Sequence, residues 1–154
     1  MKNRLLVIGF FLVTVVCYGQ RNAQPNIVFI LADDMGWKDL GCYGNPFNET
    51  PNLDKLAKNG VRFTQAYSAC PVCSPTRASI MTGKHPARLH LTNYIAGNRV
   101  DKSSPVIPPK WRAELDPAEV TLAELLKTKG YATGMVGKWH LHSKEAGKLR
   151  VQGP

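Results

Sequence analysis

The 154-residue chain lacks several features that mark common protein classes. No apolar run reaches the roughly 20 residues that a helix needs to cross a bilayer, and the longest run, residues 5–16, falls well short. We therefore expect no stable membrane anchor. There is also no basic run with interleaved aromatic residues, which argues against nucleic acid as a partner. No internal repeat is present, and one domain with a packed core is expected at this length.

Residues 1–20 have the pattern of a secretory signal peptide. Two basic residues precede the apolar run, and the small residues of "CYG", 17–19, supply the cleavage positions. A lipoprotein anchor at Cys17 is a weaker interpretation, because the bulky Val16 precedes it. We expect export, with residues 21–154 left in the periplasm or outside the cell.

Acidic residues and cysteines are both few. The 11 acidic residues against 20 basic ones give a net charge of +9, which suits either an anionic substrate or a solvated basic surface. After signal cleavage, Cys42, Cys70 and Cys73 would remain in an oxidising compartment. Their odd number leaves at least one of them free or modified.

The apolar pattern predicts an α/β fold with a mainly parallel sheet flanked by helices. Residues 26–32, "NIVFILA", form a continuous apolar run that is typical of a strand buried on both faces. Residues 61–67 and 131–136 predict two further strands. Strands that alternate with helices are typical of such folds.

Helix-start signals lie between the predicted strands. Helices are predicted over 51–59 with Thr50 as N-cap, from about Pro75, and over 121–130. In the last of these, Thr121 and Glu124 have the spacing of a capping box, and Gly130 stands at the stop. Residues 88–116, which contain three prolines, are expected to be an irregular insertion.

Reactive side chains follow all three predicted strands, at the edge of the sheet where sites collect. They are Asp33 and Asp34, then Cys73, then Lys138 and His140. Adjacent carboxylates repel each other, so Asp33 and Asp34 suit a hard cation such as Ca²⁺ or Mg²⁺. A solvated loop start is the other interpretation of this pair.

The C-x-x-C of Cys70 and Cys73 has several possible uses. A thiol–disulfide pair is plausible between a strand and a helix. A zinc site would lack a second well-spaced pair, since His140 and His142 are weak candidates. A helix N-terminus beside Cys73, together with Arg77 four residues on, would instead bind sulfate or phosphate.

Arg77, Lys138 and His140 indicate a functional site only when they are considered together. Arg77 alone would be an ordinary surface charge on a helix. Lys138 and His140 are two residues apart, so in an extended segment they point to the same face and suit anion binding and proton transfer. Taken alone, that pair would be surface decoration.

The segment "PVCSPTRASIMTG", residues 71–83, closely resembles the signature of type I sulfatases, with the C-x-P-x-R core at Cys73, Pro75 and Arg77. "GYATGMVGKWH", residues 130–140, resembles their second signature, and "NIVFILADDMGWKDLGCYGN", residues 26–45, resembles their opening strand and metal loop. The resemblance implies the fold of the alkaline-phosphatase-like superfamily. It also implies that residues 21–154 are the N-terminal part of a longer catalytic domain.

The resemblance implies a formylglycine nucleophile made from Cys73. A formylglycine-generating or anaerobic sulfatase-maturating enzyme would read Pro75 and Arg77 and oxidise the cysteine. One hydroxyl of the hydrated aldehyde would attack sulfur and form a sulfate ester on the enzyme, and the second would allow sulfate to leave. The substrate would be a sulfated small molecule or carbohydrate.

The resemblance also assigns roles to individual residues. The metal ligands for calcium would be Asp33, Asp34 and the modified Cys73, and the catalytic residues would be Cys73, Arg77, Lys138 and His140. Arg77 would hold the modified side chain, Lys138 would contact the sulfate, and His140 would act as the base for sulfate ejection. Further ligands and a leaving-group histidine lie downstream in the family, so this chain alone is expected to be inactive.

Three alternatives remain from the sequence. They are a phosphonate or phosphate ester hydrolase of the same superfamily, an exported thiol oxidoreductase using Cys70 and Cys73, and a non-catalytic remnant. Residues 88–116 resemble segments of the arylsulfatase A and N-acetylgalactosamine-6-sulfatase type, which favours a sulfated sugar as substrate.

Overall fold

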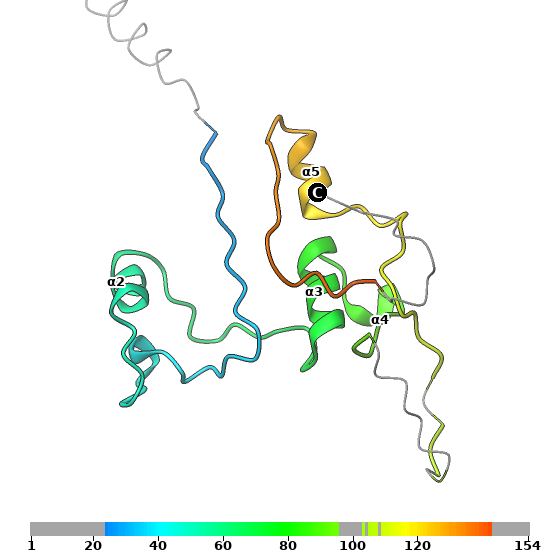
Figure 1. Ribbon diagram of the computed structural model, residues 1–154, viewed down its shortest axis with the longest axis horizontal. Helices are drawn as coiled ribbons and strands as arrows, with labels where there is room; N and C mark the ends of the chain where they lie inside the picture. The colour runs from blue at the N-terminus through cyan, green and yellow to red at the C-terminus, as the bar shows by residue number, and fades with distance from the viewer. Residues whose placement is uncertain (1–23, 96–102, 104, 108, 143–154) are drawn as a thin grey trace, which may run out of the picture. The chain divides into compact units, whose positions relative to one another are not determined.

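A computed structural model describes residues 24–95, 103, 105–107 and 109–142. The predicted signal peptide, residues 1–20, lies outside the described residues. The chain divides into two compact units, Met1–Met35 and Gly36–Pro154. In the first unit, residues 24–35 run as an extended trace (Figure 1).

The helices of the second unit follow the sequence signals closely. They are η1 (Gly41–Tyr43), α2 (Pro51–Asn59), α3 (Cys73–Thr82), α4 (Pro86–Leu89) and α5 (Leu122–Lys127) (Figure 1). The prediction of α2 is confirmed, whereas α3 begins at Cys73 instead of near Pro75. The predicted irregular segment overlaps α4, which the sequence analysis missed. Within the described part, no helix combines the length and apolarity required to cross a membrane.

The three predicted strands are not formed among the described residues. A β-strand is defined by hydrogen bonds to a neighbouring strand, and no described segment supplies such a ladder to 26–32, 61–67 or 131–136. The apolar side chains of residues 26–32 are accordingly exposed, with Val28 82% and Ile30 81% accessible. Among these residues, the helices of the predicted α/β pattern are therefore present without the sheet.

One network of hydrogen bonds joins η1 to α2. The Thr50 hydroxyl accepts from the Gly41 N–H at 2.8 Å and donates to Asp54 Oδ1 at 3.0 Å, and the Cys42 N–H donates to the same oxygen at 2.7 Å. A Cβ on Gly41 would lie 2.7 Å from Asp54 Oδ2, so any other residue here would displace the carboxylate that holds this network. Thr50 precedes the helix as predicted, but its hydroxyl bonds η1 instead of capping α2.

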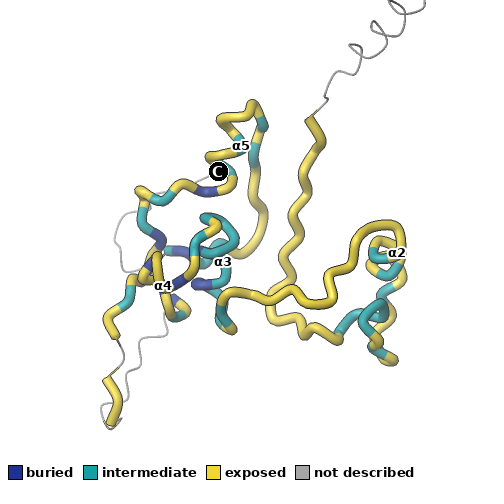
Figure 2. Tube along the Cα trace, turned by 180° about the vertical axis from the view of Figure 1, so that it is seen from behind, coloured by how far each residue is buried: buried dark blue, intermediate teal, exposed yellow. Residues whose placement is uncertain are grey.

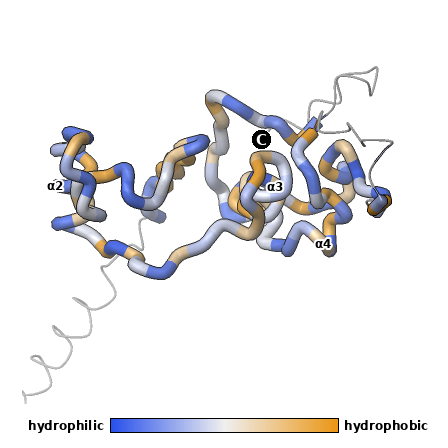
Figure 3. Tube along the Cα trace, turned by 90° about the horizontal axis from the view of Figure 1, so that it is seen from below, coloured by the Kyte–Doolittle hydropathy of each residue, from blue (hydrophilic) through white to orange (hydrophobic). Residues whose placement is uncertain are grey.

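The core lies around α3 and α4. Its buried members come from distant parts of the chain: Ala78, Leu89, Leu91, Leu115 and Leu141, with Met81 and Trp139 packed against them. Figure 2 shows the buried residues gathered in this region, and Figure 3 shows that apolar residues also occur along the rest of the trace. The Leu115 N–H donates to the Leu141 carbonyl at 3.0 Å, so the segment before α5 is bonded to the segment that follows residues 131–136.

The predicted capping box of α5 is confirmed. The Thr121 hydroxyl accepts from the Glu124 N–H at 3.3 Å, and Glu124 Oε2 accepts from the Thr121 N–H at 2.7 Å. The Thr121 N–H and hydroxyl both donate to this carboxylate and hold the pKa of Glu124 below its ordinary value. At the other end, Gly130 adopts a left-handed φ of 83° and closes the helix with backbone bonds to Lys127 and from Tyr131 to Leu126.

We predict that Thr121→Ala lowers the free energy of unfolding by about 1 kcal/mol, because an N-cap hydroxyl is lost. The deficit should shrink in acid. The folded-state pKa of Glu124 is lowered, so its contribution is complete above the pKa of the unfolded chain and is lost as pH falls through the folded value. Urea unfolding followed by circular dichroism at neutral and acidic pH measures both effects.

The matched control is Thr128→Ala, which removes a hydroxyl that bonds the Leu125 carbonyl at the exposed C-terminal end of the same helix. Equal urea midpoints for the two variants at neutral pH would contradict the importance of the capping box.

Candidate functional site

Cys73 is the first residue of α3. The preceding Val72 is extended and provides no side-chain cap, so the N–H groups of the first turn face the surroundings of Cys73. The Thr76 hydroxyl donates to the Cys70 carbonyl at 2.6 Å and ties the loop before the helix to its first turn. Cys42, Cys70 and Cys73 are all free thiols. The site is therefore built around an open helix N-terminus with an available thiol.

Arg77 joins this helix to the segment that carries Lys138. Its side chain is only 8% exposed, and its Nη1 donates to the Lys138 carbonyl. The alternative of a surface charge is therefore wrong for Arg77. The Lys138 ammonium lies 3.4 Å from the Cys73 sulfur. Arg77 thus fixes the backbone of the residue whose cation stands beside Cys73.

His140 reaches the same helix turn through an intermediate residue. Its Nε2 lies 3.1 Å from the Ile95 carbonyl oxygen, and the Ile95 N–H donates to the Ser74 hydroxyl at 3.0 Å. The φ of His140 is 55°, a left-handed value that is uncommon outside glycine. The expectation of an extended segment from Lys138 to His140 is therefore wrong at its last residue. The Lys138 ammonium contacts Cys73, whereas the His140 ring contacts Ile95.

Ser74 and Ile95 are functional candidates that sequence reasoning missed. Both are buried, with 0% and 4% of their surface exposed. Ser74 had a signal, since it stands beside Cys73 within the signature segment. Ile95 had none, because its contribution is made by backbone atoms in a stretch expected to be irregular.

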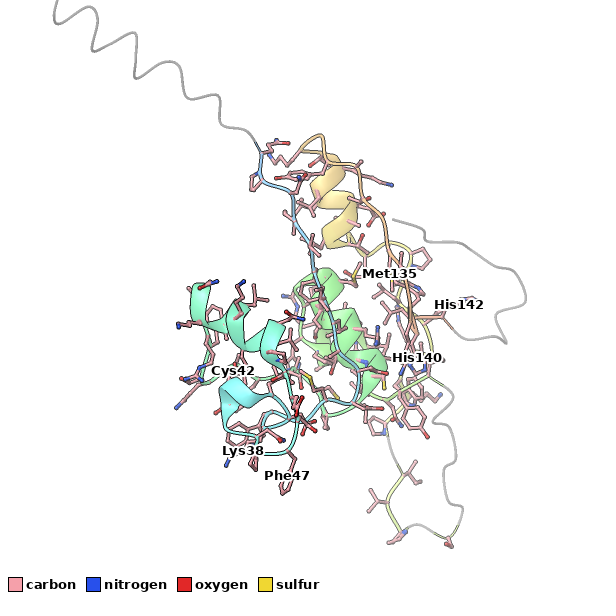
Figure 4. The ribbon with its side chains drawn as sticks, turned by 60° about the vertical axis from the view of Figure 1, so that its left-hand side comes forward. Lys38, Cys42, Phe47, Met135, His140 and His142 are labelled. Carbon is pink, nitrogen blue, oxygen red and sulfur yellow. The ribbon has the colours of Figure 1, made fainter. Side chains whose placement is uncertain are left out.

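His142 was a weak candidate for a zinc ligand. Its Nδ1 lies 3.6 Å from Glu114 Oε2, and it follows His140 on the same segment (Figure 4). Protonated histidine and a carboxylate form an ion pair in this arrangement, so His142 has a structural partner.

Asp33 and Asp34 belong to the first unit, whereas the other candidate residues belong to the second. Both aspartates are exposed, and Asp34 has a left-handed φ of 56°. Their carboxylate oxygens fit a hard cation such as calcium. The Cys73 thiol does not, because sulfur is a soft ligand, and this position supplies oxygen only after chemical conversion. The two aspartates therefore fit a calcium ion by the chemistry of their oxygen atoms.

Comparison with known proteins gives a consistent result. A family model described as Sulfatase matches residues 25–150. Human arylsulfatase A is 49% identical over 117 residues, which cover 76% of this chain and 21% of that protein. Rat N-acetylgalactosamine-6-sulfatase is 48% identical over 119 residues, covering 76% and 22%. Human steryl-sulfatase is 39% identical over 150 residues, covering 94% and 25%.

A solved sulfatase structure concerned with the metabolism of multiple glycosaminoglycans by Bacteroides thetaiotaomicron matches with a TM-score of 0.59 and 42% identity. The match covers 76% of this chain and 22% of that chain. The resemblance read from the three sequence segments is thereby confirmed. The chain spans about a fifth to a quarter of the length of the curated relatives it matches.

We predict that Arg77→Lys lowers the free energy of unfolding by about 1–3 kcal/mol, because a buried hydrogen bond of the guanidinium is lost while the positive charge is kept. Urea unfolding measures the change. Arg88→Lys on α4 is the matched control, since Arg88 is exposed. If both variants unfold at the same urea concentration, the bond from Arg77 to Lys138 does not stabilise this unit.

Proposed function

Because the chain belongs to the sulfatase family, we propose that the protein hydrolyses a sulfate ester with a formylglycine nucleophile made from Cys73 and with a calcium ion. One observation carries the proposal. The Lys138 ammonium lies 3.4 Å from Cys73, at the open N-terminus of α3, and Arg77 holds the Lys138 backbone there. The family's α/β fold, of the alkaline-phosphatase-like kind, provides the frame for this site.

Formylglycine is proposed because thiol and hydroxyl side chains lack the second hydroxyl that the hydrated aldehyde supplies for releasing sulfate. Conversion is a two-electron oxidation in which the side chain gains oxygen and loses its sulfur as sulfide, and a maturation enzyme supplies the oxidant. The free, half-buried thiol of Cys73 within C-x-P-x-R supports this assignment.

The chain's own residues create a site for an anion. The Lys138 ammonium and the N–H groups of the first turn of α3 both favour a negatively charged group beside Cys73. Positive charge placed in advance also stabilises the charge that develops in the transition state. His140 is proposed as the base that accepts a proton when sulfate leaves. One of its two ring nitrogens meets the Ile95 carbonyl, so the proton would go to the other.

Calcium would be held by Asp33, Asp34 and the converted Cys73 side chain. When bound, the cation would neutralise the adjacent carboxylates and draw a sulfate oxygen toward the nucleophile. The exposure of both aspartates leaves them accessible to an ion.

A sulfated carbohydrate is the proposed substrate class, and residues 1–20 are the proposed export signal. The names of two similar proteins support the substrate, one an N-acetylgalactosamine-6-sulfatase and the other a structure concerned with glycosaminoglycan metabolism. The similarity to steryl-sulfatase makes an apolar sulfated alcohol the comparison substrate for any specificity assay.

We predict that, in the full-length enzyme of which this chain forms part, Cys73→Ala abolishes turnover of an activated aryl sulfate, because the nucleophile is absent, and leaves the circular dichroism spectrum unchanged. Cys70→Ala, the matched control, should affect only stability or yield. Mass spectrometry of the peptide containing residue 73 should show sulfur replaced by an aldehyde in the wild-type protein.

A disulfide between Cys70 and Cys73, with loss of activity in both variants, would replace the sulfatase proposal by the thiol oxidoreductase. An unmodified Cys73 in protein that turns over a phosphate ester would favour the phosphatase alternative.

We predict that, in the full-length enzyme, a chelator removes sulfatase turnover and added calcium restores it. Asp34→Asn should raise the calcium concentration for half-maximal turnover on the order of 10-fold, because a charged ligand is lost. Calcium titration by calorimetry should show the same weakening without reference to activity. Asp39→Asn is the control, since Asp39 bonds the Gly36 N–H and is not a proposed ligand. Unchanged calcium affinity in Asp34→Asn would remove this residue from the metal site.

A further inference from the structure

We propose that Ser74 is a positioning residue that acts through Ile95 to fix which ring nitrogen of His140 carries its proton. The inference rests on the proposed function, in which His140 is the base. Ser74 is not among the residues to which the family resemblance assigns a role. The inference also names Nδ1 of His140 as the atom that accepts the proton.

Ile95 is held on both sides of its α-carbon. Its N–H donates to the Ser74 hydroxyl at 3.0 Å, and its carbonyl oxygen lies 3.1 Å from His140 Nε2. Ser74 has no exposed surface, and Ile95 is 4% exposed, so water competes little for either bond. The position of the carbonyl that His140 meets therefore depends on the hydroxyl of the residue next to Cys73.

The identity of the partner atom decides the state of the ring. A carbonyl oxygen can only accept, so Nε2 must donate and carry the hydrogen. In the neutral ring, Nδ1 then has a free lone pair. This atom is buried and has no hydrogen-bond partner among the described residues. Since an unpaired buried acceptor is costly, its retention fits a group that accepts a proton during the reaction.

The contact between the His140 ring and the Ile95 carbonyl is not needed to hold the segment around His140 in place. Leu141, the next residue, is already buried in the core, and Arg77 already holds the carbonyl of Lys138. The ring contact is therefore additional to the bonds that fix the segment. The left-handed backbone of His140 is a further cost at a site that simple anchoring would leave relaxed.

Nuclear magnetic resonance tests the proposal directly on the purified protein. Long-range proton–nitrogen correlations distinguish the two neutral forms of each ring, and the chain has only 4 histidines to assign. We expect wild-type His140 to be entirely in the Nε2–H form, and Ser74→Ala to give a mixture. An Nδ1–H form in the wild type, or an unchanged form in a folded Ser74→Ala variant, would overturn the proposal.

Enzyme kinetics give a second test. Because Ser74 is next to Cys73, its substitution can change the fraction of protein that carries formylglycine, so each rate is divided by that fraction. In Ser74→Ala we expect kcat to fall about 10–100-fold with KM nearly unchanged, the range seen when a partner that orients a histidine is removed. Ser74→Thr, which keeps a hydroxyl, should recover most of the rate. Ser79→Ala is the matched control on the same helix, where the hydroxyl bonds the Lys84 carbonyl at 2.7 Å.

The two proposals fail differently. A full-length wild-type enzyme that carries formylglycine but has no turnover defeats the sulfatase function, and the ring form of His140 still decides the role of Ser74. A wild-type protein with turnover, in which Ser74→Ala loses no rate relative to Ser79→Ala, defeats the positioning role alone.

Discussion

The hydrogen bond from the Arg77 guanidinium to the Lys138 carbonyl joins α3 to a segment 61 residues further along the chain. A buried guanidinium must find partners for its N–H groups, so its place in the helix dictates where the later segment runs. Once that segment is fixed, the Lys138 ammonium stands at Cys73 and His140 stands at Ile95. The side chain that the family resemblance assigns to the modified residue 73 thus bonds the backbone of Lys138 here.

The first turn of α3 contains two kinds of contact in adjacent residues. Cys73 faces the Lys138 cation and is half-buried, whereas Ser74 is fully buried and bonds the Ile95 backbone. A helix turn changes direction by about 100° per residue, so neighbours in sequence necessarily face different surroundings. One residue is left available for chemistry while the next fixes the position of the group that would assist it.

Local signals in the sequence were sufficient to predict α2 and α5, whereas α4 was missed. The capping box of Thr121 and Glu124 and the start of α2 at Pro51 depend on atoms within a few residues, and both were predicted. The predicted strands are not formed in the part of the chain that the structure describes, because a strand exists only through a partner that can lie anywhere in the sequence. The candidate site likewise has a part that the sequence predicts and a part that it does not. The residue types of Cys73 and Arg77 identified the family, but the contact made by the Ile95 carbonyl has no signature in a side chain.

The burial of the signature segment has a consequence for the order of events during biosynthesis. Pro75 is fully buried, and Arg77 is occupied by the Lys138 carbonyl, so the folded protein hides two of the residues that a maturation enzyme would read. Under the proposed function, such an enzyme would have to meet the segment before α3 packs, while the polypeptide is still extended. Folding would then set the end of the period in which Cys73 is open to conversion.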